Sequence, residues 1–150
     1  MIDTAILKAQ MAKIPINPEN AAAFYTHAFT VAPDVRQFFK GAEKLEAENV
    51  AKTKRFTHGG QRFLFSMHMV VHLANDDEMF NFYITDVMHR HTGFGLPPDM
   101  YDVPFHDVWY SFLEKKVGMS EEEKCEWEKI RHQKLLPAIM RSLKGWMGDA

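Results

Sequence analysis

The chain lacks most features that mark membrane and secreted proteins. Its single cysteine, Cys125, cannot form a disulfide within the chain. No apolar run approaches the roughly 20 residues that a membrane-spanning helix needs. The first eight residues, which include Asp3 and Lys8, lack the apolar core of a signal peptide. We therefore expect a cytoplasmic protein with no membrane partner.

The chain also lacks a large excess of charge of either sign. The chain has 18 Lys and Arg residues against 20 Asp and Glu residues, for a net charge of -2. It contains no long basic block of the kind that neutralises phosphates. We expect no nucleic-acid partner.

Strand-like alternation is absent, whereas helix signals recur along the chain. The 150 residues fit a single domain, 1–150, with a full core. Three places look like typical helix starts: Asn17 before Pro18, the turn Asn75-Asp76-Asp77, and Ser120 three residues before Glu123. The pattern predicts helices over 3–13, 17–31, 54–73, 77–90, 99–116 and 120–147, with short helical turns at 34–39 and 47–50. The expected fold class is all-α.

Phenylalanine and methionine are plentiful, with 12 and 10 residues. Such side chains fill irregular space, including space around a large flat ligand. Composition alone favours the simpler interpretation, an aromatic-rich core.

One histidine ends the apolar stripe of a predicted helix. Phe80, Ile84, Val87 and His91 follow one another at steps of four, three and four, so they share a face. His91 therefore projects into or near the core. A neutral imidazole there suits iron, although a lone histidine on an apolar face is more often structural.

The preceding helix carries a stripe interrupted by glycine. It consists of Phe56, Gly59 or Gly60, Phe63, Met67 and Val70. If the two helices run antiparallel about a turn near Asn75, then Gly59, Gly60 and Phe63 lie opposite His91. Glycine inside a helix costs about 1 kcal/mol relative to alanine. Two in a row indicate room for a flat ligand or a close helix crossing.

Four stretches, in this order and spacing, resemble the globin family and its nematode members in particular. They are 24–29 (FYTHAF), 33–40 (PDVRQFFK), 60–62 (GQR) with Met67-His68 downstream, and Arg90-His91 with 96–98 (LPP). The resemblance covers the chain from about Asn20 to the last helix. It implies a globin fold, a three-over-three helical sandwich around one haem b.

The resemblance also implies roles for individual residues. His91 matches the proximal iron ligand, and Tyr25 matches a distal tyrosine that hydrogen-bonds bound oxygen. Tyr25 also shares a helical face with Ala28 and Phe29, so we expect its phenol to reach inward. Phe63 matches the apolar residue over the iron, and Arg62 a basic residue that meets a haem propionate. The expected haem-binding residues are Phe39, Gly59, Arg62, Phe63, Val87, His91 and Leu96. The expected oxygen contacts are Tyr25, Gly59 and Phe63.

One position departs from the family. By ungapped spacing, Gly59 stands where the family commonly has glutamine, so a distal hydrogen-bond donor is missing. The alternative register would make His58 the distal residue. It would turn Arg62 inward in place of Phe63, and is therefore disfavoured.

Other candidate sites are weaker. His68 and His72 lie four apart and could bridge a divalent metal, but no third ligand has a recognisable spacing. His89 is read as a surface residue. Cys125 is either a small buried side chain or an exposed thiol, and carries no assigned role.

We expect reversible oxygen binding, for storage or transport, by a pentacoordinate ferrous haem, with no catalytic residue. The alternatives are a haem redox enzyme (nitric oxide dioxygenase, peroxidase-like or electron transfer) and a gas sensor in which His58 or Tyr25 ligates iron. Oxygen and other diatomic gases are the expected partners, and a homodimer is one candidate for the oligomeric state.

Overall fold

The computed structural model describes the backbone of residues 1–146 and the side chains of residues 1–144, and that part of the chain is helical without a strand. The α-helices are α1 (Thr4–Met11), α2 (Pro18–Val31), α3 (Lys54–Thr57), α4 (Gln61–His72), α5 (Asp77–Arg90), α6 (Tyr110–Lys116), α7 (Glu121–Lys129) and α8 (Leu136–Trp146). Shorter 3₁₀ turns cover Pro33–Phe38, Ala47–Lys52 and Pro98–Tyr101, and wider π-turns cover Pro104–Trp109 and Ile130–Leu135. The all-α prediction is confirmed.

Side-chain caps begin several helices, as the sequence predicts. The Asn17 side chain accepts a hydrogen bond from the Asn20 amide at the start of α2, and Asp76 accepts one from the Met79 amide at the start of α5. Ser120 and Glu123 form a reciprocal capping box at the start of α7. These short-range bonds satisfy amide groups that have no partner within the helix.

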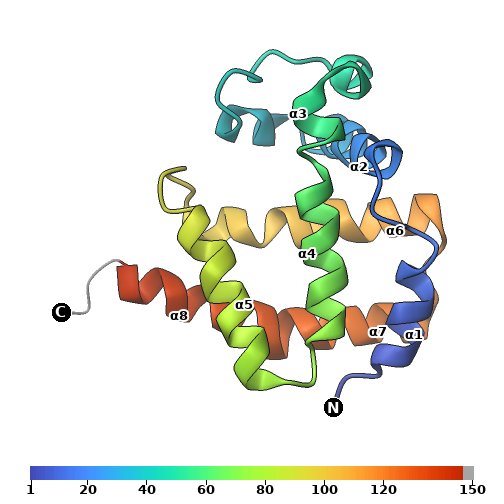
Figure 1. Cartoon of the computed structure of the whole chain (residues 1–150), viewed down its shortest axis with the longest axis vertical. Coiled ribbons are helices and arrows are strands. Elements are labelled where there is room, and N and C mark those ends of the chain that lie inside the picture. Colours follow the sequence, from blue (N-terminus) through green and yellow to red (C-terminus); the bar gives the residue numbers. More distant parts are fainter. Residues whose placement is uncertain (147–150) are drawn as a thin grey trace.

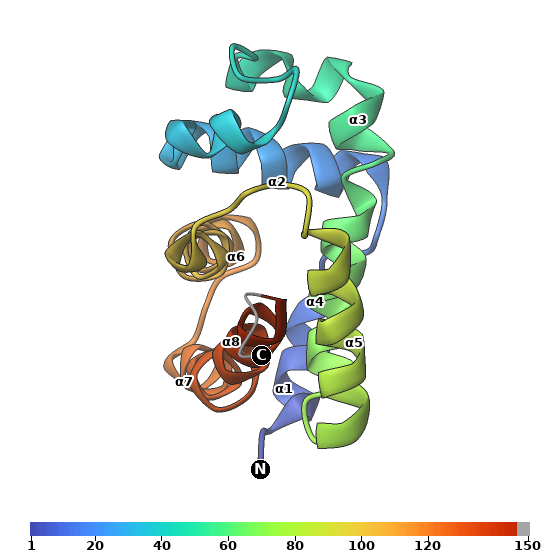
Figure 2. The same cartoon turned by 90° about the vertical axis from the view of Figure 1, so that its left-hand side faces the viewer.

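The helices form two layers that face each other across the interior (Figure 2). Figure 2 shows α4 and α5 running vertically beside α1, while α6, α7 and α8 are seen nearly end-on across the interior. α1 packs on α4 and α7, α5 packs on α8, and α2 crosses α4 and α6. α4 and α5 diverge from the turn that joins them (Figure 1). Their far ends, at residues 61 and 90, therefore lie on the same side of the molecule.

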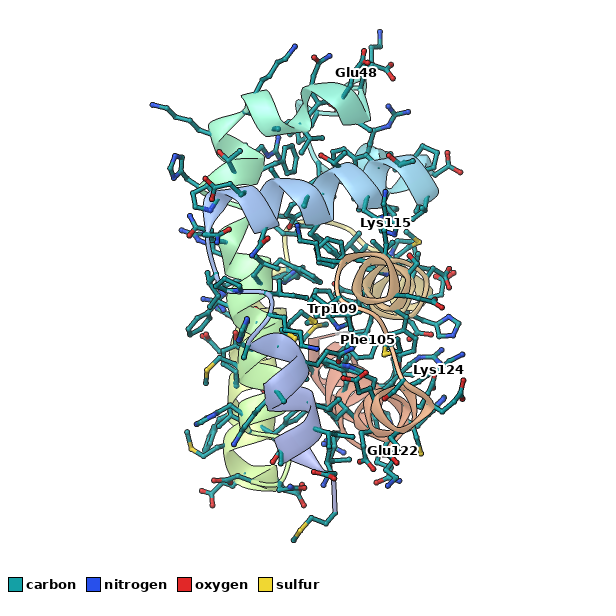
Figure 3. All side chains as sticks on the ribbon, turned by 90° about the vertical axis from the view of Figure 1, so that its right-hand side faces the viewer. Glu48, Phe105, Trp109, Lys115, Glu122 and Lys124 are labelled. Atoms are coloured by element: carbon teal, nitrogen blue, oxygen red, sulfur yellow. The ribbon has the colours of Figure 1, made fainter. Side chains whose placement is uncertain are left out.

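Large aromatic side chains fill the centre between the layers. Trp109 and Trp127 are fully buried, and their ring centroids lie 5.9 Å apart in an edge-on arrangement. Figure 3 shows Phe105 and Trp109 inside the molecule, with Glu122 and Lys124 at its periphery. Much of the phenylalanine content therefore builds the core itself.

Three predicted helices differ from the structure. The helix expected over 54–73 is interrupted at residues 58–60, because Gly59 and Gly60 favour a turn there. The helix expected from Asp99 becomes regular only at Tyr110. The last helix widens over Ile130–Leu135, just before Pro137, which lacks the amide that a regular turn would use. Its predicted end at Met147 lies outside the described residues.

One buried hydrogen-bond chain joins α1 to the far layer. The Trp127 indole Nε1 donates to Gln10 Oε1 at 2.8 Å, and Gln10 Nε2 donates to the Gly118 carbonyl at 3.0 Å. Gln10 is only 1% exposed, so water cannot replace it.

We expect Gln10→Met to lower the free energy of unfolding by about 1–3 kcal/mol, because it strands a buried indole donor and a carbonyl acceptor. Urea denaturation followed by far-ultraviolet circular dichroism measures the change. Gln37→Met, at an exposed position, is the matched control and should shift stability by less than about 0.5 kcal/mol. Equal small effects of the two variants would contradict the assigned role of Gln10.

Candidate functional site

His91 caps the C-terminal end of α5 with its ring held in one orientation. Its Nδ1 lies 2.8 Å from the Val87 carbonyl oxygen. A carbonyl can only accept, so Nδ1 carries a proton, and the neutral form of the ring with that proton has its lone pair on Nε2. Within the described chain, Nε2 has no hydrogen-bond partner. The geometry thus presents one imidazole nitrogen as a ligand donor.

Two aromatic rings from the segment after α5 flank this imidazole. The ring centroids of Phe94 and Tyr101 lie 5.3 Å and 6.1 Å from that of His91, both edge-on. Sequence reasoning missed these neighbours because the loop has no periodicity that would place them. Val87 supplies the carbonyl and is half-buried, as is Leu96 in the loop.

Tyr25 projects from α2 into a group of phenylalanines. Its ring contacts those of Phe24, Phe29, Phe39, Phe56 and Phe63, with centroid separations between 4.9 and 6.4 Å. The expectation that its phenol points inward agrees with these contacts. No described residue forms a hydrogen bond with its hydroxyl group.

Burial keeps that phenol protonated. Desolvation raises the pKa of Tyr25 to about 12, and the positive charge of Arg55 opposes part of the rise. The hydroxyl is therefore neutral at physiological pH and free to donate a hydrogen bond to a ligand.

Phe39 and Phe63 contribute the apolar surface beside Tyr25. Phe63 stacks on Phe24 at 4.2 Å and contacts Trp109 edge-on at 5.8 Å. Phe39 lies edge-on to Phe29, at 5.6 Å. Both are half-buried, so each also presents surface that these protein contacts leave uncovered.

The two adjacent glycines differ in their surroundings. Gly60 is buried, and a Cβ there would lie 3.0 Å from Tyr25 Cε2 and collide with the Phe56 carbonyl oxygen. Gly59 is exposed, and a Cβ there would collide with the Arg55 carbonyl oxygen. The close helix crossing that the glycine pair indicates therefore occurs at Gly60. Gly59 lies in the exposed turn between α3 and α4.

The remaining candidates lie toward the surface or bond elsewhere. Arg62 and His58 are exposed beside the 58–60 turn. His68 Nε2 donates to the Ile14 carbonyl at 2.8 Å, and His72 is exposed. Cys125 is exposed on α7. No cluster of three metal-binding side chains was found among the described residues, and none of the described helices is both long and apolar enough to cross a membrane.

The residues present fit a haem group. An imidazole Nε2 with a free lone pair is a common protein ligand for haem iron. The half-buried aromatic side chains of Phe39 and Phe63 suit the faces of a flat apolar macrocycle. The unpaired Tyr25 hydroxyl adds one polar group among them.

Comparisons with known proteins agree with this geometry. The Globin family model matches residues 22–134. A myoglobin of Nippostrongylus brasiliensis is 36% identical over 83% of this chain and 77% of its own. A cuticular globin isoform of the same nematode is 34% identical over 75% of this chain and 65% of its own.

A solved structure agrees as well. The globin-like protein of Caenorhabditis elegans superposes with a TM-score of 0.90 at 27% identity, over 96% of this chain and 93% of that one. The chain therefore belongs to the globin family, and resembles its nematode members throughout the fold.

Proposed function

We propose that this globin binds oxygen reversibly at a pentacoordinate haem b, with His91 as the only protein ligand to the iron. The observation that carries the proposal is the hydrogen bond from His91 Nδ1 to the Val87 carbonyl, which leaves Nε2 as a ligand donor. Haem, when bound through His91, would supply an iron centre that can take up oxygen.

The other residues around the site have three separate roles in this proposal. Phe39, Phe63, Val87 and Leu96 exclude water from the haem faces, and Arg62 offers a cation to a propionate at the surface. Tyr25 donates a hydrogen bond to a diatomic ligand that gathers negative charge. Such a bond to a charged acceptor in a buried site is worth about 1.5–3 kcal/mol.

A hydrogen bond from Tyr25 that retains bound oxygen favours oxygen storage or transport over redox turnover, because the retained oxygen is protected from reaction with water. The exposed turn at Gly59 favours a haem redox activity instead, since no side chain there closes the site. Absorption spectra of the ferric, ferrous, oxygen and carbon monoxide forms separate these functions. A stable oxygen form supports storage or transport, whereas rapid conversion to the ferric form supports redox turnover.

We also propose that the protein is cytoplasmic and forms a homodimer. The exposed lone thiol of Cys125 supports a reducing compartment. Exposed apolar side chains on α4 and α5, those of Phe65, Met79 and Phe82, offer surface for self-association. Cell fractionation and sedimentation velocity test the two statements.

We expect His91→Gly to abolish stable haem retention, and added imidazole to restore it, because the free base can occupy the position that the side chain vacates. The haem absorption that remains after gel filtration measures retention. His89→Gly places glycine two residues earlier at an exposed position. It controls for the helix cost of about 1 kcal/mol. Full retention in His91→Gly without imidazole would contradict the assignment.

We expect Tyr25→Phe to accelerate oxygen dissociation roughly 10- to 150-fold, and carbon monoxide dissociation far less, because carbon monoxide gathers little negative charge. Stopped-flow mixing measures both rates. Tyr83→Phe is the control, because the Tyr83 hydroxyl on α5 bonds to Ser66 on α4, at 2.9 Å, and not to a ligand. Equal acceleration for both gases would mean that Tyr25 acts by its shape alone.

A further inference from the structure

Arg55 connects α3 to the segment that carries Phe39. Its Nη1 donates to the Lys40 carbonyl at 2.6 Å, fifteen residues earlier in the chain. Its guanidinium carbon lies 5.8 Å from the Phe39 ring centroid and 5.3 Å from that of Phe56. Both separations fall within the range of a cation–π interaction. One exposed side chain therefore contacts two rings and a backbone carbonyl.

The turn that follows Phe39 lies against this guanidinium. Gly41 has a φ of 91°, a conformation that favours glycine, and the Ala42 amide donates to the Phe39 carbonyl at 2.8 Å. A Cβ on Gly41 would lie 3.7 Å from Arg55 Nη1. Arg55 therefore packs along residues 39–41 and limits how far this turn can move from α3.

The two rings that Arg55 contacts, those of Phe39 and Phe56, also pack against Tyr25. Phe39 lies edge-on to Tyr25 at 5.8 Å, and Phe56 lies tilted against it at 4.9 Å. The positive charge of Arg55 also lowers the pKa of the Tyr25 phenol against the larger effect of burial. A more acidic phenol is a stronger hydrogen-bond donor.

We propose that Arg55 is a positioning residue for the oxygen-binding side of the site: it holds the turn at Phe39–Gly41 against α3 and keeps a positive charge beside Tyr25. Its consequence for oxygen rests on the proposed donor role of Tyr25. The two physical effects on the chain do not, and they are measured independently of oxygen.

Two substitutions at this position separate the effects. Arg55→Met keeps much of the length and removes the charge and every donor. Arg55→Lys keeps the charge but loses the planar group that contacts two rings and a carbonyl together. Lys54→Met is the matched control, since the adjacent Lys54 is exposed and its side chain forms no hydrogen bond, ion pair or ring contact within the described residues.

A second arginine serves as a comparator for a purely structural role. Arg36 Nη1 donates to the Leu45 carbonyl at 3.1 Å, so it holds the same loop, but Arg36 is not among the charges that shift the pKa of Tyr25. Arg36→Met should therefore loosen the loop and leave the Tyr25 phenol unchanged.

The first measurement is amide hydrogen exchange over residues 39–45 of the haem-loaded chain under carbon monoxide, read by mass spectrometry. We expect exchange to rise roughly tenfold in Arg55→Met and in Arg55→Lys, because both lose the bond to Lys40 and the ring contacts. Lys54→Met should match the unmodified chain.

The second measurement is the ionisation of Tyr25 in the same samples. Fluorine NMR of chains labelled with 3,5-difluorotyrosine follows each phenol, and the Tyr25 signal is the one that Tyr25→Phe removes. We expect the acid dissociation constant to fall roughly threefold or more in Arg55→Met, because a positive charge that stabilises the phenolate is lost. Arg55→Lys, which keeps the charge, should stay near the original value.

The proposal is overturned if Arg55→Met changes either quantity no more than Lys54→Met does. It is also overturned if Arg36→Met shifts the Tyr25 ionisation as far as Arg55→Met, since loosening of the loop would then explain the shift. Oxygen dissociation from Tyr25→Phe separately tests the donor role of Tyr25. The two failures can therefore be told apart.

Discussion

The proposed chemistry of this globin depends on one short hydrogen bond, from His91 Nδ1 to the Val87 carbonyl. The last turn of α5 leaves this carbonyl available, because its normal partner, the amide of His91, bonds to Met88 instead. The bond fixes the tautomer and the direction of the ring together. Without it, either nitrogen could carry the proton and the ligand atom would not be defined.

The opposite side of the site depends on a close approach between α2 and the turn before α4. Gly60 lets Tyr25 pass at a distance that no other residue would permit without displacement. The tyrosine ring is then enclosed by phenylalanines, so that burial both orients the phenol and keeps it protonated. Gly60 weakens the helix locally, but it leaves the space that the Tyr25 ring occupies.

The sequence predicted much of this arrangement, for identifiable reasons. Phe80 and Ile84 are buried on the face of α5 that leads to His91, because their spacing matches the helical repeat. The caps at Asn17, Asp76 and Ser120 were predictable since a capping bond spans three residues. The site roles of Phe39, Arg62 and Leu96 came from family resemblance and stay predictions.

What the sequence by itself determined were the features that short-range forces control: the helical class, most helix starts, and the placement of His91 and Tyr25 on inward faces. Only the tertiary structure decided which glycine meets Tyr25, that Phe94 and Tyr101 flank His91, and that Arg55 contacts two rings and the Lys40 carbonyl. Those contacts join residues from loops and from distant segments. Neither periodicity nor capping encodes such pairings, because they arise from how complete helices cross when the shared core packs.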